Sequence, residues 1–148
     1  ARRAAGSRPG EAGVKFDAIK PGLVGEVRLV VAPEHTAKHL GSGGVQVLAT
    51  PHMVLLMERA GVAAVDSLLP EGYLTVGAHL DVRHLSPTPV GFEVVARAEL
   101  LEVDGRSLTF RVTLHDGMEV AGEGLHHRAI VSLERFGQRV AEKAKQRE

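Results

Sequence analysis

One helical segment, residues 53–65, most constrains how this chain can fold. Ten of its thirteen residues are aliphatic or methionine, and its only polar residues are Glu58 and Arg59. A helix on the surface of a soluble protein normally carries a wide polar face, which this segment lacks. The helix must therefore be enclosed, either by a sheet of the same chain or by a partner chain.

Local signals predict where this helix begins and ends. Thr50 is a good N-cap, and Pro51 suits the first helical position because its missing N–H would have no partner there. The helix is expected to run to about Leu69 and to stop at Pro70-Glu71-Gly72.

The rest of the chain is predicted to be mainly strand. Residues 24–31 are rich in β-branched side chains, which favours a first strand. Later segments alternate apolar and polar residues with a period of two, and Asp-Gly pairs between them signal hairpins. These segments are 74–82, 94–100, 108–114 and 118–131, and a polar helix over 133–145 follows. The order predicts an α+β fold, in which four strands form an antiparallel meander and one curved sheet wraps around one long apolar helix.

Composition narrows the class of protein. Residues 1–13 are predicted to form a flexible basic tail ahead of one domain, residues 14–148. The chain has 18 basic and 18 acidic residues, so no net charge attracts nucleic acid or an anionic membrane. It has no apolar run of the roughly 20 residues that a membrane span needs, and no signal-peptide core, so we expect a cytoplasmic protein. Cysteine is absent, which excludes disulfides and thiolate catalysis.

Glu58 is the first candidate site residue. Its helical neighbours three and four positions away are Val54, Leu55, Gly61 and Val62, so nothing on its own helix pairs with it. A buried carboxylate without a partner has a raised pKa or finds hydrogen bonds elsewhere. Glu58 is therefore either a functional acid or a structural one that forms a salt bridge across an interface.

Thr50 and His84 are further candidates. Thr50 is either only a helix cap or part of a helix N-terminus that could stabilise an oxyanion. His84 continues the even-numbered apolar series of residues 74–82, which places it on the core-facing side near the end of a strand. It is either a hydrogen-bonded core histidine or a catalytic one.

The other histidines do not predict a metal site. His35 and His39 have helical spacing but lack the acidic residue of the two-histidine zinc-protease pattern. His126 and His127 are neighbours in a predicted strand, so their side chains point to opposite faces. We therefore predict no metal and no cofactor.

Three runs of the chain resemble the fluoroacetyl-CoA thioesterase-like group of the hotdog-fold thioesterases. The runs are GSGGVQVLATPHMVLLMERA at 41–60, TVGAHLDVRHLSPTPVG at 75–91 and GEGLHHRAIV at 122–131. The similarity extends from about Lys20 to Val140 without long insertions. It implies a hotdog fold and an acyl-CoA thioesterase that releases a carboxylic acid and free coenzyme A, with coenzyme A as part of the substrate.

The resemblance also implies roles for individual residues. The catalytic set falls on Thr50, Glu58 and His84, and a glycine whose N–H positions the thioester carbonyl falls on Gly77. Arg128 matches a basic residue that lines the substrate site. Members of this group are homodimers or higher homo-oligomers with the site at the subunit interface. The stretch before Thr50 has no aromatic residue, so the resemblance extends to hydrolysis of a short or medium acyl chain and not to fluoroacetyl specificity.

Two alternative functions remain. Hotdog dehydratases and hydratases act on related thioesters, but their His-Gly-His-Phe-Pro run and Asp-x(4)-His pair are missing here. A non-catalytic acyl-CoA-binding module would need only the ligand groove, and the co-occurrence of Thr50, Glu58 and His84 counts against it.

Overall fold

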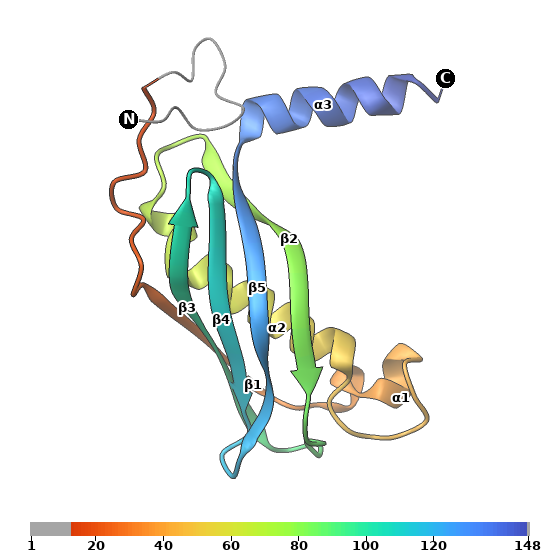
Figure 1. Ribbon diagram of the computed structural model, residues 1–148. Coiled ribbons are helices and arrows are strands. Elements are labelled where there is room, and N and C mark those ends of the chain that lie inside the picture. The colour runs from red at the N-terminus through yellow and green to blue at the C-terminus, as the bar shows by residue number, and fades with distance from the viewer. Residues whose placement is uncertain (1–12, 148) are drawn as a thin grey trace.

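Residues 13–147 are described by a computed structural model, so nearly all of the predicted tail lies outside the described residues. Five strands form one antiparallel sheet in the order β1-β3-β4-β5-β2, and one long helix lies against it (Figure 1). The strands are β1 (Val24–Val30), β2 (Tyr73–His84), β3 (Glu93–Asp104), β4 (Ser107–His115) and β5 (Val120–Ser132). The helices are η1 (Pro33–His35), α1 (Ala37–Leu40), α2 (Thr50–Val65), η2 (Asp66–Leu68) and α3 (Leu133–Lys145).

The apolar helix α2 is enclosed by the sheet, as its composition predicts. The sheet curls around it, and the buried side of α2 packs on alternate residues of β3 and β4 (Figure 1). The core includes Met53, Leu56, Met57, Ala60, Ala64, Val65, Ala96, Leu108, Phe110 and Val112. The sheet covers only part of the helix, because Leu55 and Val62 remain 36% and 39% exposed. An apolar stripe of α2 therefore faces away from the sheet.

Strand β1 approaches α2 so closely that one position must be glycine. A Cβ on Gly25 would collide with the backbone oxygen of Ala60 and the backbone nitrogen of Ala64. Backbone atoms of a packed helix cannot move aside as a side-chain end can, so a methyl group here would separate the strand from the helix.

Gly25→Ala is accordingly expected to lower the free energy of unfolding by about 1–3 kcal/mol, the usual cost of overpacking a core. Urea denaturation followed by circular dichroism measures it. Gly44→Ala is the matched control, since nothing lies within 4 Å of the added methyl group. Equal stability of the two variants would contradict the close packing of β1 on α2.

Strand pairing corrects one part of the predicted topology. Strands β3, β4 and β5 form a meander with the two predicted Asp-Gly turns, but β2 pairs with β5 and not with β3. The connection after β2 is tied to the segment before α2, because Leu48 N–H donates to the carbonyl of Thr88. Residues 85–92 lead the chain from β2, at one edge of the sheet, to β3, next to β1 at the other edge, and no hairpin forms.

The start of α2 corrects a second prediction. Ala49 is the N-cap, Thr50 is already the first helical residue, and the Thr50 hydroxyl caps no backbone N–H. The α-helix ends at Val65, earlier than the predicted Leu69, and the turn η2 follows. The Asp66 carboxylate accepts hydrogen bonds from the backbone N–H and the hydroxyl of Thr75, which fixes η2 to the start of β2.

Strand β2 corrects a third prediction, the single alternation over residues 74–84. A β-bulge lies between Gly77 and His79 and shifts the register against β5. Before the bulge, Thr75 and Gly77 face α2, so the predicted inward positions Leu74 and Val76 are wrong. After the bulge the inward series is Leu80, Val82 and His84, so the predicted orientation of His84 is confirmed.

Helix α3 has the predicted bounds and extends from the end of β5, away from the sheet (Figure 1). Its first residue follows Ser132, whose hydroxyl accepts a hydrogen bond from Arg135 N–H as an N-cap. Among the described residues, no helix is long and apolar enough to cross a membrane.

Candidate active site

The start of α2 and the end of β2 bring Thr50 and His84 together. Thr50 Oγ1 lies 2.7 Å from His84 Nδ1, a hydrogen-bond distance. The two residues line a pocket of about 330 Å³ beneath the segment that connects α1 to α2. The pocket is also lined by Ala37, Ser42, Gly43, Val45, Val47, Leu48, Leu85, Ser86 and Pro87. This pair joins a hydroxyl to a titratable base at the wall of a largely apolar pocket.

The His84 ring is held in a form suited to accept a proton. Burial lowers the pKa of His84 from its usual 6.5, and the nearby Ser86 backbone only partly offsets this shift. The ring is therefore neutral at pH 7. Nε2 is buried, and within residues 13–147 it forms no hydrogen bond.

Glu58 lies further along α2 than Thr50, beside Gly77 of β2. A Cβ at position 77 would lie only 2.5 Å from Glu58 Oε2, so the absence of a side chain there makes space for the carboxylate. Arg128 Nη1 lies 3.8 Å from the same Oε2. The Glu58 side chain is 36% exposed and that of Arg128 only 4%, so the carboxylate forms the outer part of this ion pair.

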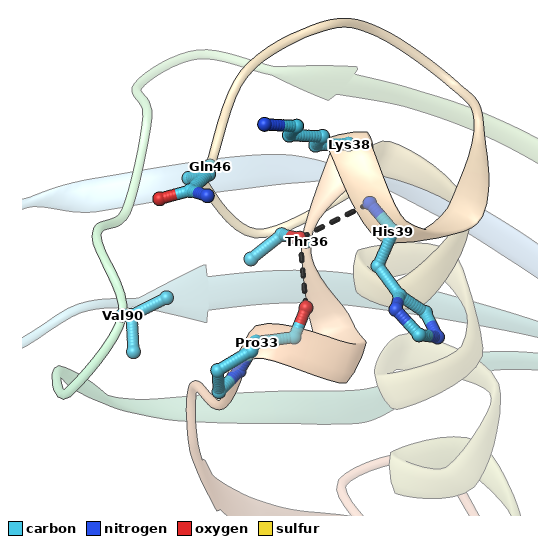
Figure 2. Close-up of a pocket in the computed structure, with 6 residues that line it drawn as sticks. All are labelled: Pro33, Thr36, Lys38, His39, Gln46 and Val90. Atoms are coloured by element: carbon cyan, nitrogen blue, oxygen red, sulfur yellow. Dashed lines mark hydrogen bonds between the residues drawn. The ribbon is translucent and has the colours of Figure 1, made fainter.

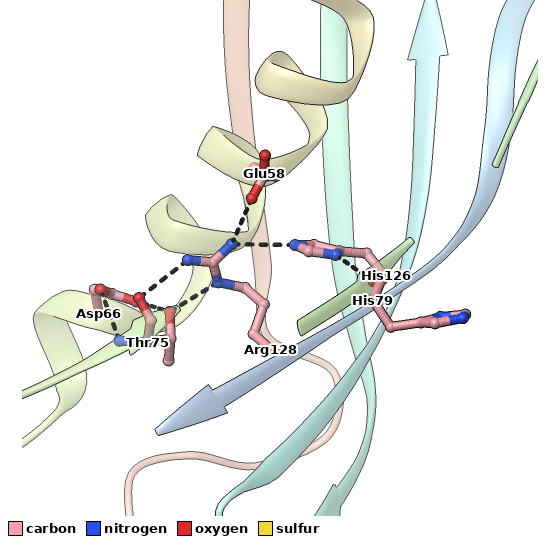
Figure 3. Close-up of polar contacts among 6 residues, drawn as sticks. All are labelled: Glu58, Asp66, Thr75, His79, His126 and Arg128. Carbon is pink, nitrogen blue, oxygen red and sulfur yellow. Dashed lines mark hydrogen bonds and ion pairs between the residues drawn. The ribbon is translucent and has the colours of Figure 1, made fainter. Parts of the chain in front are cut away.

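Arg128 is fixed by further hydrogen bonds on β2 and β5 (Figure 3). Its Nε donates to Thr75 Oγ1 at 2.8 Å, and its Nη2 donates to the Thr75 carbonyl at 3.0 Å. Nη1 lies 3.1 Å from His126 Nε2, and Thr75 in turn donates to Asp66. Burial lowers the pKa of Arg128, and the charges of Asp66 and Glu58 oppose that shift.

The predicted site residues thus form two contacting groups. Thr50 meets His84, and Glu58 meets Gly77 and Arg128. Within the described part of the chain, no hydrogen bond joins one group to the other. Both groups lie between α2 and β2, which run side by side in opposite directions, so they form one strip along the helix.

Sequence reasoning missed three members of the second group: Thr75, Asp66 and His126. His126 and His127 do point to opposite faces, as predicted, and His126 is the buried one. The i, i+2 spacing of His126 and Arg128 could have signalled a shared face of β5. Thr75 could not have been found, because the regular alternation of the sequence predicts that it points away from α2. The bulge after Gly77 makes it point toward α2 instead.

A second pocket, of about 470 Å³, lies beside η1 and α1 (Figure 2). Pro33, Thr36, Lys38, His39, Gln46 and Val90 line it. The Thr36 hydroxyl bonds only within this segment, donating to the Pro33 carbonyl and accepting from His39 N–H. None of the candidate catalytic residues lines this pocket. Nor does any group of three or more His, Asp or Glu within residues 13–147 form a possible metal site.

Comparison with known proteins identifies the family. Residues 31–134 match the family model described as fluoroacetyl-CoA-specific thioesterase. The chain belongs to this family. Thr50, Glu58, Gly77, His84 and Arg128 all lie inside the matched segment of this fluoroacetyl-CoA-specific thioesterase family member.

Individual relatives of the fluoroacetyl-CoA-specific thioesterase family cover most of the chain. A fluoroacetyl-CoA thioesterase from Streptantibioticus cattleyicolor is 40% identical over 77% of this chain and 86% of its own length. A solved structure of a fluoroacetyl-CoA thioesterase superposes with a TM-score of 0.78 and 37% identity, covering 84% of this chain and 97% of that one.

The fold has a wider set of neighbours. A hot-dog-like protein from Thermanaerovibrio acidaminovorans superposes with a TM-score of 0.79 at 23% identity, over 86% of this chain and 94% of that one. The curled five-stranded sheet around α2 is therefore the hotdog fold that the resemblance implies.

Proposed function

We propose that this protein is an acyl-CoA thioesterase that hydrolyses short or medium acyl thioesters to a carboxylic acid and free coenzyme A. Membership of the fluoroacetyl-CoA-specific thioesterase family and the 40% identical relative support thioester hydrolysis. The observation that carries the proposal is the 2.7 Å contact between Thr50 and His84 at the wall of a pocket. The segment at 41–48 holds no aromatic residue, which favours a general short-chain substrate over a fluoroacetyl specialist.

In this proposal His84 carries the proton during the reaction. Neutral His84 accepts the proton of the attacking oxygen and returns it to the departing thiolate, so that a C–O bond forms and the C–S bond breaks. The attacking oxygen belongs to Thr50 or to a water molecule that Thr50 and Glu58 orient. If the Glu58 carboxylate attacks instead, it has no proton to give up, and His84 takes the proton of the water that then hydrolyses the acyl-enzyme. Intact-protein mass spectrometry during turnover separates these routes, because an acyl-enzyme accumulates only when a side chain attacks.

Glu58 and Gly77 supply the second half of the proposed site. The Glu58 carboxylate activates the water or attacks the thioester, and its negative charge is held in place by Arg128. Either the backbone N–H of Gly77 or the free N–H groups at the start of α2 can stabilise the developing oxyanion. Arg128 is buried behind Glu58, which favours a role in holding the carboxylate over the direct substrate contact that the resemblance implies.

We propose in addition that two copies of the chain form a homodimer. Leu55 and Val62 form an apolar stripe on the side of α2 that the sheet leaves open. Strand β2 is an edge of the sheet, and its free backbone groups are suited to pair with another strand. A second copy of the chain would cover both the apolar stripe and the β2 edge, next to Glu58. Sedimentation equilibrium measures whether the protein has the mass of a dimer.

Release of free thiol across a panel of acyl-CoA esters tests the proposed activity. Thiol release from short or medium acyl chains is expected. Hydration of crotonyl-CoA with the thioester intact would instead support the hydratase alternative. Binding of acyl-CoA without thiol release would support the non-catalytic module.

The proposed role of His84 also predicts a pH dependence. Because His84 must be neutral to accept a proton and burial lowers its pKa below 6.5, kcat/KM is expected to stay high at pH 7. It should fall only as the pH decreases below 6.5, when the ring becomes protonated. Circular dichroism at each pH serves as the control for folding. If kcat/KM already fell above pH 7 as the pH was lowered, this role of His84 would be contradicted.

A further inference from the structure

The buried His126 ring is hydrogen-bonded on both sides. Its Nδ1 lies 2.9 Å from the backbone carbonyl of His79, and its Nε2 lies 3.1 Å from Arg128 Nη1 (Figure 3). A carbonyl can only accept and a guanidinium can only donate. Nδ1 must therefore carry a proton and Nε2 a lone pair. These partners select the neutral ring and one of its two tautomers.

The β-bulge supplies one of these partners. His79 is the first residue after the register shift in β2, and its carbonyl accepts from the inward-facing His126 while its own side chain is exposed. The His79 ring instead lies beside that of His127, with ring centroids 5.3 Å apart, on the opposite face of the sheet. The histidine pair on the outer face and the buried His126 are thus separate structures.

Two glycines leave the space that His126 and Arg128 occupy. A Cβ on Gly61 of α2 would lie 3.0 Å from Arg128 Cδ and 3.6 Å from His126 Cδ2. A Cβ on Gly77 of β2 would lie 3.6 Å from His126 Cε1. The ring and the guanidinium therefore fit closely between helix and strand, where a small displacement of one moves the other.

We propose that His126 is a positioning residue for Glu58, and that it acts through Arg128 only as the neutral, Nδ1-protonated ring. The lone pair on Nε2 holds Nη1 of Arg128 in the orientation that faces the Glu58 carboxylate. Because Glu58 is assigned to catalysis only by the proposed function, the effect on hydrolysis rests on that proposal.

Protonation of His126 would reverse the interaction with Arg128. An imidazolium has N–H groups on both nitrogens, so two donors and two positive charges would meet at 3.1 Å. The charged and titratable groups around the ring are Arg128 and His127 of β5 and Glu58 of α2, and from β4 the uncharged Phe110 ring lies 6.4 Å away.

The surroundings keep His126 neutral at pH 7. Burial lowers the pKa of His126, and Arg128 lowers it further, while the His79 carbonyl and Glu58 oppose the shift. The acid side of the activity profile should therefore contain two ionisations, one of His84 and one of His126.

The test compares two substitutions of His126 with one of its neighbour. His126→Leu removes the acceptor and is expected to lower kcat by roughly 10- to 100-fold with KM almost unchanged, as misplacement of a catalytic group does. His126→Gln offers Oε1 to Arg128 and is expected to restore most of this loss. His127→Gln is the matched control, because His127 lies on the opposite face of the same strand.

The pH profile separates positioning from mere packing. A plot of log kcat/KM against pH is expected to approach a slope of two on the acid side in the wild type and in His127→Gln. In His126→Gln the slope should be smaller by one, since the ionisation of His126 is lost. A wild-type rate in His126→Leu, or equal slopes in the wild type and His126→Gln, would overturn the proposal.

Nitrogen NMR tests the ring without relying on activity. In ¹⁵N-histidine-labelled protein at pH 7, the signals that His126→Gln removes are expected to show a protonated Nδ1 and an unprotonated Nε2. A proton on Nε2, or a charged ring, would refute the inference whether or not the protein hydrolyses thioesters. Absence of thiol release with the expected tautomer would instead reject the proposed function alone.

Discussion

Replacing Glu58 with glutamine is expected to lower kcat for acyl-CoA hydrolysis by about 10²-fold or more, the usual loss when a catalytic acid–base or electrostatic group is removed. The amide has nearly the same shape as the carboxylate and can still place an oxygen beside Gly77. It carries no negative charge, so it can neither accept a proton from water nor attract Arg128, 3.8 Å away. Initial rates of thiol release measure the effect.

Glu93→Gln is the matched control for this substitution. Glu93 forms a comparable ion pair with Arg28 at 3.3 Å, but both side chains are more than half exposed. Surface ion pairs contribute little to stability, so this variant should keep wild-type activity and melting temperature. If Glu58→Gln turned over acyl-CoA as fast as Glu93→Gln, Glu58 would have no part in the chemistry.

Gly77→Ala should lower kcat to a similar degree without unfolding the protein. Its methyl carbon would lie 2.5 Å from Glu58 Oε2, well inside van der Waals contact, so the carboxylate must move. The displaced atom is the end of a half-exposed side chain, which can rotate away at little cost in folding free energy. A displacement of about 1 Å in a reacting group can reduce the rate by roughly 10²-fold, so activity should respond far more than stability.

Thermal melting and kcat measured on the same preparations separate these two effects. Gly137→Ala in α3 is a suitable control, because nothing lies within 4 Å of its added methyl group. Gly77→Ala with unchanged kcat would show that the present position of Glu58 is not required. A large drop in melting temperature would show that the strand, and not only the carboxylate, has moved.

The fold could be predicted because the strongest sequence signal comes from burial. A helix as apolar as α2 has few possible surroundings, and the regular alternation in β3 and β4 leaves one sheet face to enclose it. The pairing of β2 with β5 could not be predicted, because it depends on where residues 85–92 lead the chain. Those residues are held by a contact with Leu48, distant in sequence, that no local pattern reveals.

The candidate site was predicted in part. The resemblance implied one catalytic set that includes Thr50 and His84, but their contact depends on Thr50 being the first helical residue, one position away from the expected cap. Arg128 was expected to line the substrate site, and in the structure its side chain is 4% exposed and hydrogen-bonded to Thr75 and His126. These partners come from segments about fifty residues apart, and the bulge in β2 conceals that Thr75 faces inward.

The bulge in β2 also limits how the length of this strand can change during evolution. Gly77 lies before the extra residue and His84 after it, and each faces α2 only because the extra residue separates them. Deleting or inserting one residue between them would turn either Gly77 or His84 to the outer face of the sheet. Exposed turns that line neither group of site residues can tolerate such length changes. We therefore expect insertions and deletions among active relatives to be tolerated in the loops and selected against between positions 77 and 84.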